Sequence, residues 1–474
     1  MEMTQKRTGE TIPRILLTAP KSGSGKTLIT CGMIEVFRRR GRKPAAFKCG
    51  PDYIDPMFHR YVSGVGGANL DSFFLDEAGV RRVLTETVTE TESGSCVMEG
   101  VMGYYDGVSG TELTASTYDI ARITRTPAIL IVDAKGASRS LVPLISGFLH
   151  YPKESDAPGQ RGSGIAGVIL NRTTAMMAKI LGEMIRNECG IPVLGFLPES
   201  EDWKMESRHL GLFLPHEISD LRRKIGLLAD QMEKSFDMDA IFALADGSEP
   251  VETEAIAEKE QTYIPETSRT RVRIAAAVDE AFCFYYQENR RMMEKMGAEI
   301  VPFSPIHDAK LPEGIAGLIL EGGYPELFAR ELSENHAMLA QIRAVSEQSM
   351  PILAECGGFM YLHEEMEGAD GNRYPAVGVI RGRTFRTPKL GRFGYISLAG
   401  PHSDKIRGHE YHYWDSTDCG GDWTAVKPNG RSWNCIHDRD GMIAGFPHFY
   451  YPSDPDFVEQ WLAMCRNWRN TDER

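Results

Sequence analysis

The chain has 474 residues, of which 42% are hydrophobic and 25% charged, and its formal net charge is −13. This length indicates two or three domains, and the acidic balance argues against binding to nucleic acid or to anionic membranes. Nine cysteines without a CxxC pair favour a reducing compartment over a disulfide framework or a zinc site. The N-terminal residues lack the apolar core of a signal peptide, and no apolar run reaches the roughly 18 residues of a membrane helix. We therefore expect a cytoplasmic protein.

Short apolar strands alternate with helical patterns through the first half of the chain. Residues 15–19 have the pattern of a buried strand, and residues 28–40 have apolar side chains at helical spacing and end in basic residues. Residues 128–132 and 167–170 are continuously apolar, as strands are when both of their faces are buried. This alternation predicts a parallel sheet that is covered by helices on both faces.

A polar, acidic stretch over residues 246–270 separates the two halves of the chain. It is poor in large apolar residues, which is typical of an interdomain linker. Beyond it a second alternation begins, with a helix expected at 287–297 and strands at 273–278, 299–303, 318–321 and 352–355. The sequence thus predicts two α/β domains, at residues 1–245 and 271–474.

The segment APKSGSGKT, residues 19–27, lies between the first predicted strand and the first predicted helix. A phosphate-binding loop requires this context, because its glycines let backbone N–H groups surround phosphate oxygens at a helix N-terminus. Ala19 stands where the common pattern has glycine, but the SGSGKT core is complete. Lys26 is expected to hold the β- and γ-phosphates of ATP, and the Thr27 hydroxyl to bind Mg²⁺. The predicted nucleotide-binding residues of the loop are Ser22, Gly23, Ser24, Gly25, Lys26 and Thr27.

Acidic side chains follow the ends of two further predicted strands. Asp52 and Asp55 lie in the loop FKCGPDYIDP, and Glu99 ends an apolar stretch in VMEGVMG. Because the carboxyl ends of parallel strands meet at one edge of a sheet, we expect these acids near the γ-phosphate, where they hold Mg²⁺ or orient a substrate. An aspartate in such a loop is also ordinary turn chemistry, and Asp133 at the end of another strand has the same ambiguity.

The segment AECGG, residues 354–358, lies between an apolar strand and a predicted helix over 359–366. A strand-to-helix elbow points its central side chain outward, and a helix N-terminus lowers the pKa of a thiol. Cys356 is therefore predicted to attack the side-chain amide of glutamine, giving a thioester and ammonia; the alternative is a buried structural cysteine. Glycine N–H groups are the natural donors of an oxyanion hole, unless they only form a turn. The predicted donors are Gly322, Gly323 and Gly357.

Together these motifs resemble those of the cobyrinate a,c-diamide synthase family. The resemblance covers nearly the whole chain, in the family's order, through APKSGSGKT, FKCGPDYIDP, NLDSFF, MEGVMGYYDG, VILNR, DEAFCFYY, LEGGYPELFA, LAECGGFMYL and GHEYHY. Similar families act on hydrogenobyrinate and Ni-sirohydrochlorin or make cobyric acid. The resemblance implies an N-terminal domain like dethiobiotin synthetase, which binds ATP and a tetrapyrrole, and a C-terminal domain like the class I glutamine amidotransferases.

The resemblance also implies roles for residues whose function spacing alone leaves open. Asn171, in VILNR, would contact the adenine of ATP. Thr27, Asp52 and Glu99 would bind Mg²⁺. The residues implied to bind the carboxylates of the substrate are Asp52, Tyr53, Asp55 and Glu99.

His448, in AGFPHFY, matches the family's catalytic base, which would deprotonate Cys356 and later protonate the leaving ammonia. Many related glutaminases carry a glutamate two residues after this histidine, whereas this chain has Tyr450, so the group that orients the base is left open. His409 and His412 compete with His448, but without a third ligand they do not indicate a metal site, and a structural or substrate-facing role fits them better.

The expected reaction has two halves. ATP phosphorylates a carboxylate of the macrocycle, and ammonia released at Cys356 displaces the phosphate, twice over for a diamide. The same chemistry on another macrocycle is an alternative, and so is a P-loop ATPase switch whose glutaminase-like domain only binds a partner; intact Cys356 and His448 argue against the switch. The expected partners are a tetrapyrrole, glutamine and ATP. A homodimer stays open, and Lys21 either reaches a phosphate across its interface or is a solvated surface residue.

Overall fold

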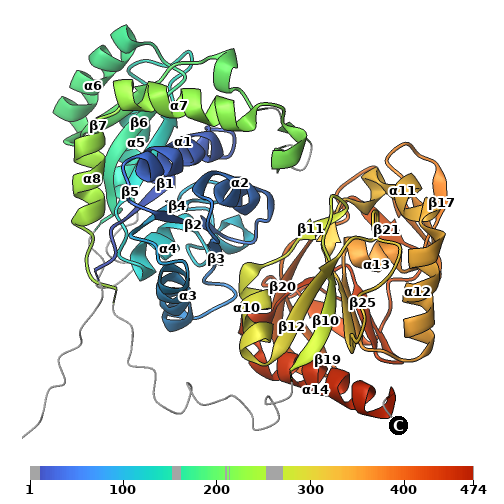
Figure 1. Ribbon diagram of the computed structural model, residues 1–474. Helices are drawn as coiled ribbons and strands as arrows, with labels where there is room; N and C mark the ends of the chain where they lie inside the picture. The colour runs from blue at the N-terminus through green and yellow to red at the C-terminus, as the bar shows by residue number, and fades with distance from the viewer. Residues whose placement is uncertain are drawn as a thin grey trace, which may run out of the picture. The chain divides into compact units, whose positions relative to one another are not determined.

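The computed structural model describes residues 11–151, 162–205, 207–208, 211–212, 214–251 and 271–472. The chain divides into two compact units, Met1–Ile256 and Ala257–Arg474, and each is an α/β unit (Figure 1). Residues 252–270 of the predicted linker lie outside the described residues, so the exact domain borders stay a prediction. Just before them, the Ser248 hydroxyl donates a hydrogen bond of 2.9 Å to the Arg14 carbonyl, which ties residue 248 to the first unit.

A parallel sheet of seven strands forms the centre of unit 1, in the order β3-β2-β4-β1-β5-β6-β7 (Figure 1). The strands are β1 (Arg14–Thr18), β2 (Pro44–Cys49), β3 (Ala68–Leu70), β4 (Ser95–Glu99), β5 (Ala128–Asp133), β6 (Ile165–Asn171) and β7 (Val193–Leu197). β1 to β4 are buried along their whole length, which is expected where a parallel sheet is covered on both faces. The strands predicted at 15–19, 128–132 and 167–170 are confirmed.

Helices and short ribbons complete unit 1. They are α1 (Lys26–Arg39), α2 (Ile54–Ser63), α3 (Glu77–Glu90), α4 (Thr117–Ile123), α5 (Leu141–His150), α6 (Ala175–Cys189), α7 (Leu221–Ser235) and α8 (Met238–Asp246), with η1 (Val108–Gly110), η2 (Glu201–Trp203), η3 (Pro215–Glu217), β8 (Ser207–Arg208) and β9 (Gly211–Leu212). α1 packs closely on α7 at Gly32, where an added Cβ would lie 2.3 Å from the Met232 sulfur. This contact fixes the helix that begins at the phosphate-binding loop.

The strand order of unit 1 decides which strand ends surround this loop. β1, which leads into the loop, pairs with β4 on one side and β5 on the other. In register, Glu99 of β4 lies opposite both Leu17 of β1 and Lys48 of β2. The ends of β2 and β4 therefore lie at the edge of the sheet where the loop begins, as the sequence predicts for adjacent parallel strands.

Unit 2 is built on a six-stranded sheet in the order β12-β10-β13-β15-β25-β24, parallel except for the antiparallel edge strand β24. The strands are β10 (Val272–Ala277), β12 (Ala298–Phe303), β13 (Gly317–Leu320), β15 (Ile352–Glu355), β24 (His437–Arg439) and β25 (Met442–Gly445). The helices are α10 (Gln287–Lys295), α11 (Ala329–Glu334), α12 (His336–Glu347), α13 (Gly357–Tyr361) and α14 (Pro455–Asp472), with η5 (Pro325–Leu327) and η6 (Tyr451–Ser453). The strands and the helix predicted between residues 273 and 355 are confirmed.

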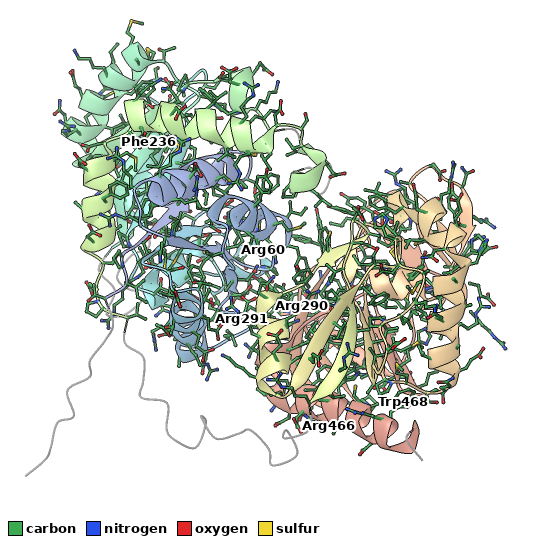
Figure 2. The ribbon with its side chains drawn as sticks, in the orientation of Figure 1. Arg60, Phe236, Arg290, Arg291, Arg466 and Trp468 are labelled. Carbon is green, nitrogen blue, oxygen red and sulfur yellow. The ribbon has the colours of Figure 1, made fainter. Side chains whose placement is uncertain are left out.

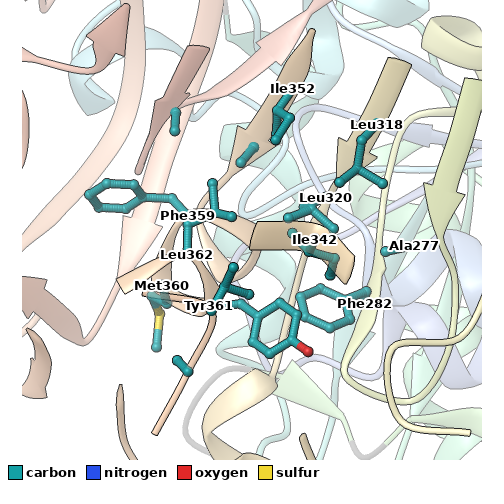
Figure 3. Packing of buried hydrophobic residues seen from close by; sticks show 14 of the residues in the cluster. Ala277, Phe282, Leu318, Leu320, Ile342, Ile352, Phe359, Met360, Tyr361 and Leu362 are labelled. Atoms are coloured by element: carbon teal, nitrogen blue, oxygen red, sulfur yellow. The ribbon is translucent and has the colours of Figure 1, made fainter. Parts of the chain in front are cut away.

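Alternate residues of this sheet enter two different hydrophobic clusters. Leu318 and Leu320 of β13 join the cluster that contains Phe359, part of which Figure 3 shows, whereas Ile319 joins the cluster that contains Trp461 of α14. Successive side chains of a strand point to opposite faces, so each cluster covers one face of the sheet. The cluster of Figure 3 lies beneath α13 and supports the turn at Cys356.

Smaller sheets flank the main sheet of unit 2. They contain β11 (Phe282–Phe284) with β14 (Gly322–Gly323); β16 (His363–Glu367), β17 (Arg373–Pro375), β18 (Ile380–Arg386) and β21 (Trp414–Ser416); and β19 (Arg392–Gly400), β20 (Ser403–His412), β22 (Trp423–Val426), β23 (Ser432–Cys435) and β26 (His448–Tyr450). The helix predicted over 359–366 is wrong in its second half, because α13 ends at Tyr361 and β16 begins at His363. Pairing of β16 with both β17 and β18 outweighs the local helical pattern.

Candidate active sites

The loop between β1 and α1 has the backbone that phosphate binding requires. Gly23 and Gly25 take left-handed conformations, with φ of 76° and 91°, which other residues rarely adopt. Lys26 begins α1, and its Nζ donates hydrogen bonds of 2.6 Å to the Met102 carbonyl and 3.4 Å to the Lys21 carbonyl. The segment therefore lies between a strand and a helix as expected, with its lysine held inside the loop.

The side chains of the loop differ in exposure. Ser22 and Gly23 are exposed, whereas Ser24 and Lys26 are buried. Burial, followed by the positive charge of Lys48, lowers the pKa of Lys26 to about 8. A phosphate bound in the loop would offset both effects, because its negative charge favours the protonated amine.

A cluster of charged side chains lies next to the Thr27 hydroxyl. This hydroxyl donates hydrogen bonds of 2.7 Å to Glu99 Oε1 and 3.1 Å to Asp55 Oδ1. The buried Lys48 ammonium joins the same two carboxylates, at 2.5 Å from Asp55 Oδ2 and 3.0 Å from Glu99 Oε1. His59 Nε2 lies 2.6 Å from the other oxygen of Glu99. Thr27, Asp55 and Glu99 therefore meet, as the sequence predicts.

Lys48 contacts two carboxyl groups in this cluster, and the pKa values of these two groups shift in opposite directions. Burial favours the neutral form of Glu99, but Lys48, His59 and Thr27 outweigh burial and hold its pKa well below the usual range. Burial, with Asp52 and Glu99 close by, raises the pKa of Asp55 well above the usual range despite the contact with Lys48. Glu99 thus holds the stable negative charge, and Asp55 holds a proton more readily.

Asp52 and Tyr53 lie at the start of α2, beside this cluster. Asp52 Oδ1 accepts hydrogen bonds from the backbone N–H groups of Ile54, at 2.9 Å, and Asp55, at 3.1 Å. Tyr53 is the residue directly before the helix and is half-buried. Asp52 therefore has the turn role that the sequence leaves as an alternative, and this turn positions Asp55.

Asn171, at the end of β6, contacts the phosphate-binding loop itself. Its Nδ2 donates a hydrogen bond of 2.8 Å to the Ser24 carbonyl, and a Cβ added to Gly25 would lie 2.3 Å from that nitrogen. The predicted contact of Asn171 with adenine stays a prediction. At the end of β5, Asp133 Oδ1 accepts hydrogen bonds of 2.9 Å from the Arg172 guanidinium and 3.1 Å from the Lys135 backbone N–H.

The donor set of unit 1 fits a magnesium ion bound with phosphates. Among the described residues, no group of three or more His, Cys, Asp or Glu side chains is placed to hold a metal by itself. Mg²⁺ usually binds through one or two carboxylates together with substrate phosphates, and it prefers hard oxygen ligands. The Thr27, Asp55 and Glu99 oxygens, clustered beside the loop, are of this kind.

Cys356 forms a strained turn between β15 and α13. Its backbone has φ of 46° and ψ of −100°, a conformation that costs a non-glycine residue about 1–3 kcal/mol. The Cys356 N–H donates a hydrogen bond of 2.8 Å to the Gly445 carbonyl, and its carbonyl accepts one of 2.9 Å from Met360. Gly358 permits the turn, since a Cβ there would lie 2.0 Å from the Leu320 carbonyl oxygen. The predicted strand-to-helix elbow is confirmed.

The three glycines predicted to form an oxyanion hole converge with His448. A Cβ added to Gly322 would lie 2.3 Å from His448 Cε1, and one added to Gly357 would lie 3.1 Å from the Gly323 nitrogen. Gly323 itself is opposite Phe282 in the pairing of β14 with β11. The backbone amides and the imidazole therefore lie together beside the cysteine elbow.

His448 lies on β26, and the side chains of His409 and Glu355 approach its ring. His409 is its neighbour across the β20–β26 pair, and the two rings stack with centroids 5.0 Å apart and an angle of 14°. His448 Nδ1 lies 3.6 Å from Oε2 of Glu355, the residue before the cysteine. Tyr450 packs against the Tyr286 ring instead, with centroids 5.2 Å apart.

His412 lies on β20 with His409 and has its own set of contacts. Its ring stacks on Phe446 at 3.9 Å between centroids, and its Nε2 lies 3.4 Å from Glu410. The structural or substrate-facing role expected of both histidines stays a prediction; the His412 ring stacks on Phe446, whereas the His409 ring stacks on His448.

Burial keeps the groups of this second site neutral. Burial, followed by the charges of Glu326 and Glu410, raises the pKa of the Cys356 thiol. Burial, followed by His412, lowers the pKa of His448 to about 3. Burial also raises the pKa of Glu355 to about 8, although its hydrogen bonds favour the charged form. The thiol thus keeps its proton until a substrate changes this environment.

Comparisons with known proteins match both halves of the chain. Residues 15–213 match the CobQ/CobB/MinD/ParA nucleotide binding domain, and residues 273–448 match the CobB/CobQ-like glutamine amidotransferase domain. The cobyrinate a,c-diamide synthase of Caldanaerobacter subterraneus is 34% identical over 96% of this chain and 98% of its own length. Proteins of the same name from Listeria innocua, 35% identical over 95% of this chain and 99% of their own length, and Dehalococcoides mccartyi, 34% identical over 96% and 99%, also match.

The chain belongs to the cobyrinate a,c-diamide synthase family. It is therefore an enzyme with a nucleotide-binding domain and a glutamine amidotransferase domain, as the sequence predicts. Among the described residues of this chain, no helix is both long enough and apolar enough to cross a membrane. A crystal structure of a glutamine amidotransferase is 15% identical over 41% of this chain and 98% of its own length, with a TM-score of 0.31.

Three side chains at these sites were missed by the sequence reasoning: Lys48, His59 and Glu355. A signal existed for Lys48, which interrupts the otherwise apolar strand PAAFKC and must find a partner when buried. No local signal indicates His59 or Glu355. Their partners, Glu99 and His448, are 40 and 93 residues away along the chain.

Proposed function

We propose that this chain converts the a and c side-chain carboxylates of cobyrinate into carboxamides, using ATP and the amide nitrogen of glutamine or free ammonia. Family membership supports this reaction. The observation that carries the proposal is that one chain contains two sites. In one, a strained Cys356 lies beside glycine amides and a histidine. In the other, Thr27 of a phosphate-binding loop contacts two carboxylates. One site suits nitrogen release and the other suits carboxylate activation.

At the loop of unit 1, the side chains would bind and orient the γ-phosphoryl group of ATP. Lys26 and the N–H groups at the start of α1 stabilise negative charge there, while a substrate carboxylate oxygen attacks phosphorus and ADP leaves. The product is an acyl phosphate. When bound, Mg²⁺ supplies charge neutralisation for the phosphates, and Thr27, Glu99 and Asp55, with Asp52 close by, are the residues proposed to hold it.

At Cys356, the proposed steps release ammonia from glutamine. His448 takes the thiol proton, the sulfur attacks the amide carbon, and the amides of Gly323 and Gly357 bind the oxyanion that forms. The proton on His448 passes to the leaving ammonia, and water then hydrolyses the thioester to glutamate. The ammonia attacks the acyl phosphate carbonyl and displaces inorganic phosphate, which completes one amide; a second round completes the diamide.

The remaining expectations belong to the same proposal. We propose a cytoplasmic enzyme whose partners are a tetrapyrrole, glutamine and ATP, because neither the charge of the chain nor its hydropathy suits nucleic acid or membranes. A homodimer stays untested, and with it the choice between a Lys21 that reaches a phosphate across the interface and a Lys21 that is a solvated surface residue.

The test is mass spectrometry of the tetrapyrrole after incubation with ATP, Mg²⁺ and glutamine labelled with ¹⁵N in the side-chain amide. We expect cobyrinate to gain two labelled amide nitrogens, and no product to form without ATP. Parallel incubations with hydrogenobyrinate and Ni-sirohydrochlorin identify the macrocycle. Amidation of one of these two and not of cobyrinate would correct the substrate, and ATP turnover without amidation of any of the three would contradict the proposed function.

A further inference from the structure

The carboxyl group of Glu355 faces the ring of the proposed catalytic base. Glu355 Oε2 lies 3.6 Å from His448 Nδ1, and both side chains are almost completely buried. That separation is within reach of an ion pair, and catalytic hydrogen bonds are often this long before a substrate binds. Because Glu355 directly precedes Cys356, the same strand end carries the nucleophile and the carboxyl group.

The other oxygen of Glu355 is held in place by neighbours of His448 in the sequence. The Tyr451 hydroxyl donates a hydrogen bond of 3.3 Å to Glu355 Oε1, and the Phe449 N–H also donates to this carboxyl group. These contacts join the end of β15 to β26 and to η6. Two donors therefore hold the carboxyl group, and its Oε2 is the oxygen that lies 3.6 Å from His448 Nδ1.

In this chain, Tyr450 stands at the position where many related glutaminases carry an orienting glutamate, and it makes a different contact. Tyr450 has no carboxylate, is fully buried and packs its ring edge against Tyr286. Glu355 thus brings a carboxyl group to the base from another strand.

We propose that Glu355 is the positioning residue for His448 in glutamine hydrolysis, an inference that rests on the proposed function. Glu355 Oε2 accepts the Nδ1–H of the imidazole, which leaves the lone pair on Nε2 to take the proton from Cys356 Sγ. The imidazolium that results keeps its Nδ1–H directed at the carboxylate while the sulfur forms its bond to the amide carbon. Release of ammonia returns the Nε2 proton to the leaving nitrogen.

Several titratable groups surround this pair. His448 and Tyr451 contact Glu355 directly, Cys356 follows it in the chain, and the buried ion pair of Arg290, on α10 (Figure 2), with Glu321 lies near Tyr451. Glu410 and His412 act on His448 from β20. Burial raises the pKa of Glu355 to about 8, so the carboxylate that accepts Nδ1–H is the minor form below that pH. Glutamine hydrolysis should therefore rise with pH through about 8.

The experiment measures glutamine hydrolysis and ammonia-dependent amidation against pH in the full-length enzyme and in Glu355→Gln, with ATP, Mg²⁺ and cobyrinate present. We expect kcat for glutamine hydrolysis to fall on the order of 100-fold, with little change in KM. The rise in activity near pH 8 should disappear, because the amide does not titrate. Ammonia-dependent amidation should stay within twofold, which shows that the variant is folded.

Two further variants keep the inference testable if Glu355→Gln fails to fold. Tyr451→Phe removes a hydrogen bond that favours the carboxylate, so the rise in activity should move to higher pH. Glu459→Gln removes a carboxylate paired with Arg466 on α14, which carries none of the proposed catalytic groups, and should leave the profile unchanged.

Each outcome separates this inference from the proposed function. A wild-type enzyme that hydrolyses no glutamine would contradict the proposed function itself. An active wild type whose pH profile is unaltered by Glu355→Gln or by Tyr451→Phe would overturn the role of Glu355. Loss of the rise in Glu410→Gln, with Glu355→Gln retaining it, would assign the positioning role to Glu410 instead.

Discussion

The two sites of this enzyme treat buried charge in opposite ways. Around Thr27, the positive Lys48 is buried between Asp55 and the ionised Glu99, and His59 lies on the far oxygen of Glu99. Around Cys356, buried groups are neutral, because burial raises the pKa values of the thiol and Glu355 and lowers that of His448. The site of unit 1 thus contains buried charged groups, whereas burial keeps the groups around Cys356 in unit 2 neutral.

The difference follows from the chemistry proposed for each site. Phosphoryl transfer needs fixed charges already in place around the phosphates, so the charges of unit 1 must be paired while the site is empty. A thiol nucleophile needs only one proton moved, and a neutral cysteine–histidine pair costs less to bury than an ion pair.

Replacement of Cys356 by alanine should abolish glutamine-dependent amidation, by at least about 1,000-fold, because the nucleophile is lost. Amidation driven by added ammonium should continue, since the groups around Thr27 are unchanged. Steady-state assays with each nitrogen donor make the comparison, and Cys419→Ala, a more exposed cysteine of the same unit, is the matched control. Equal loss with both donors would show that the two sites are not separable.

Lys26→Ala should give the reverse pattern to the cysteine variant. Amidation should fall about 100- to 1,000-fold with both glutamine and ammonium, because a positive group on the phosphates is removed. Glutamine hydrolysis measured without ATP should not change. Lys179→Ala on the exposed face of α6 is the control and should resemble wild type. Ammonium-driven synthesis within twofold of wild type in Lys26→Ala would argue against the nucleotide site.

Lys48→Met should destabilise unit 1 by about 3–5 kcal/mol, because the buried Asp55 and Glu99 lose their shared cation. Denaturant unfolding of the intact chain measures the effect. The control is Lys135→Met, which breaks an exposed pair with Glu199 and should cost at most about 1 kcal/mol. Similar shifts in both variants would show that burial does not distinguish the two pairs.

The buried imidazole of His363 in unit 2 should make folding stability depend on pH. Burial lowers the pKa of His363 to about 4, so below about pH 6.5 the unfolded chain binds a proton there that the folded chain does not. The unfolded state therefore gains stability as pH falls, and His363 should cost about 1.5 kcal/mol of folding stability between pH 6.5 and 5. Urea unfolding of His363→Gln should show a shallower loss over that range. Equal slopes there would contradict the shift.

Much of the fold was predictable because its signals are local. Apolar runs located β1, β5, β6, β10 and β15 to within one or two residues, since strands buried on both faces need continuous apolar sequence. The helix expected over 359–366 failed after Tyr361. Its local pattern suited a helix, but the pairing of β16 with β17 and β18 joins segments that no local window contains.

Local residue types are enough to locate the two loops that carry the chemistry: glycines and Lys26 between a strand and a helix, and Cys356 at an elbow followed by glycines. Backbone turns of this kind depend on neighbouring residues, so their residue types reveal them. The groups that place charge beside these loops, or orient their side chains, are set by the packing of distant segments. Lys48 and His59 reach Glu99, and Glu355 reaches His448, because sheet register and helix packing bring together side chains that are distant in the chain.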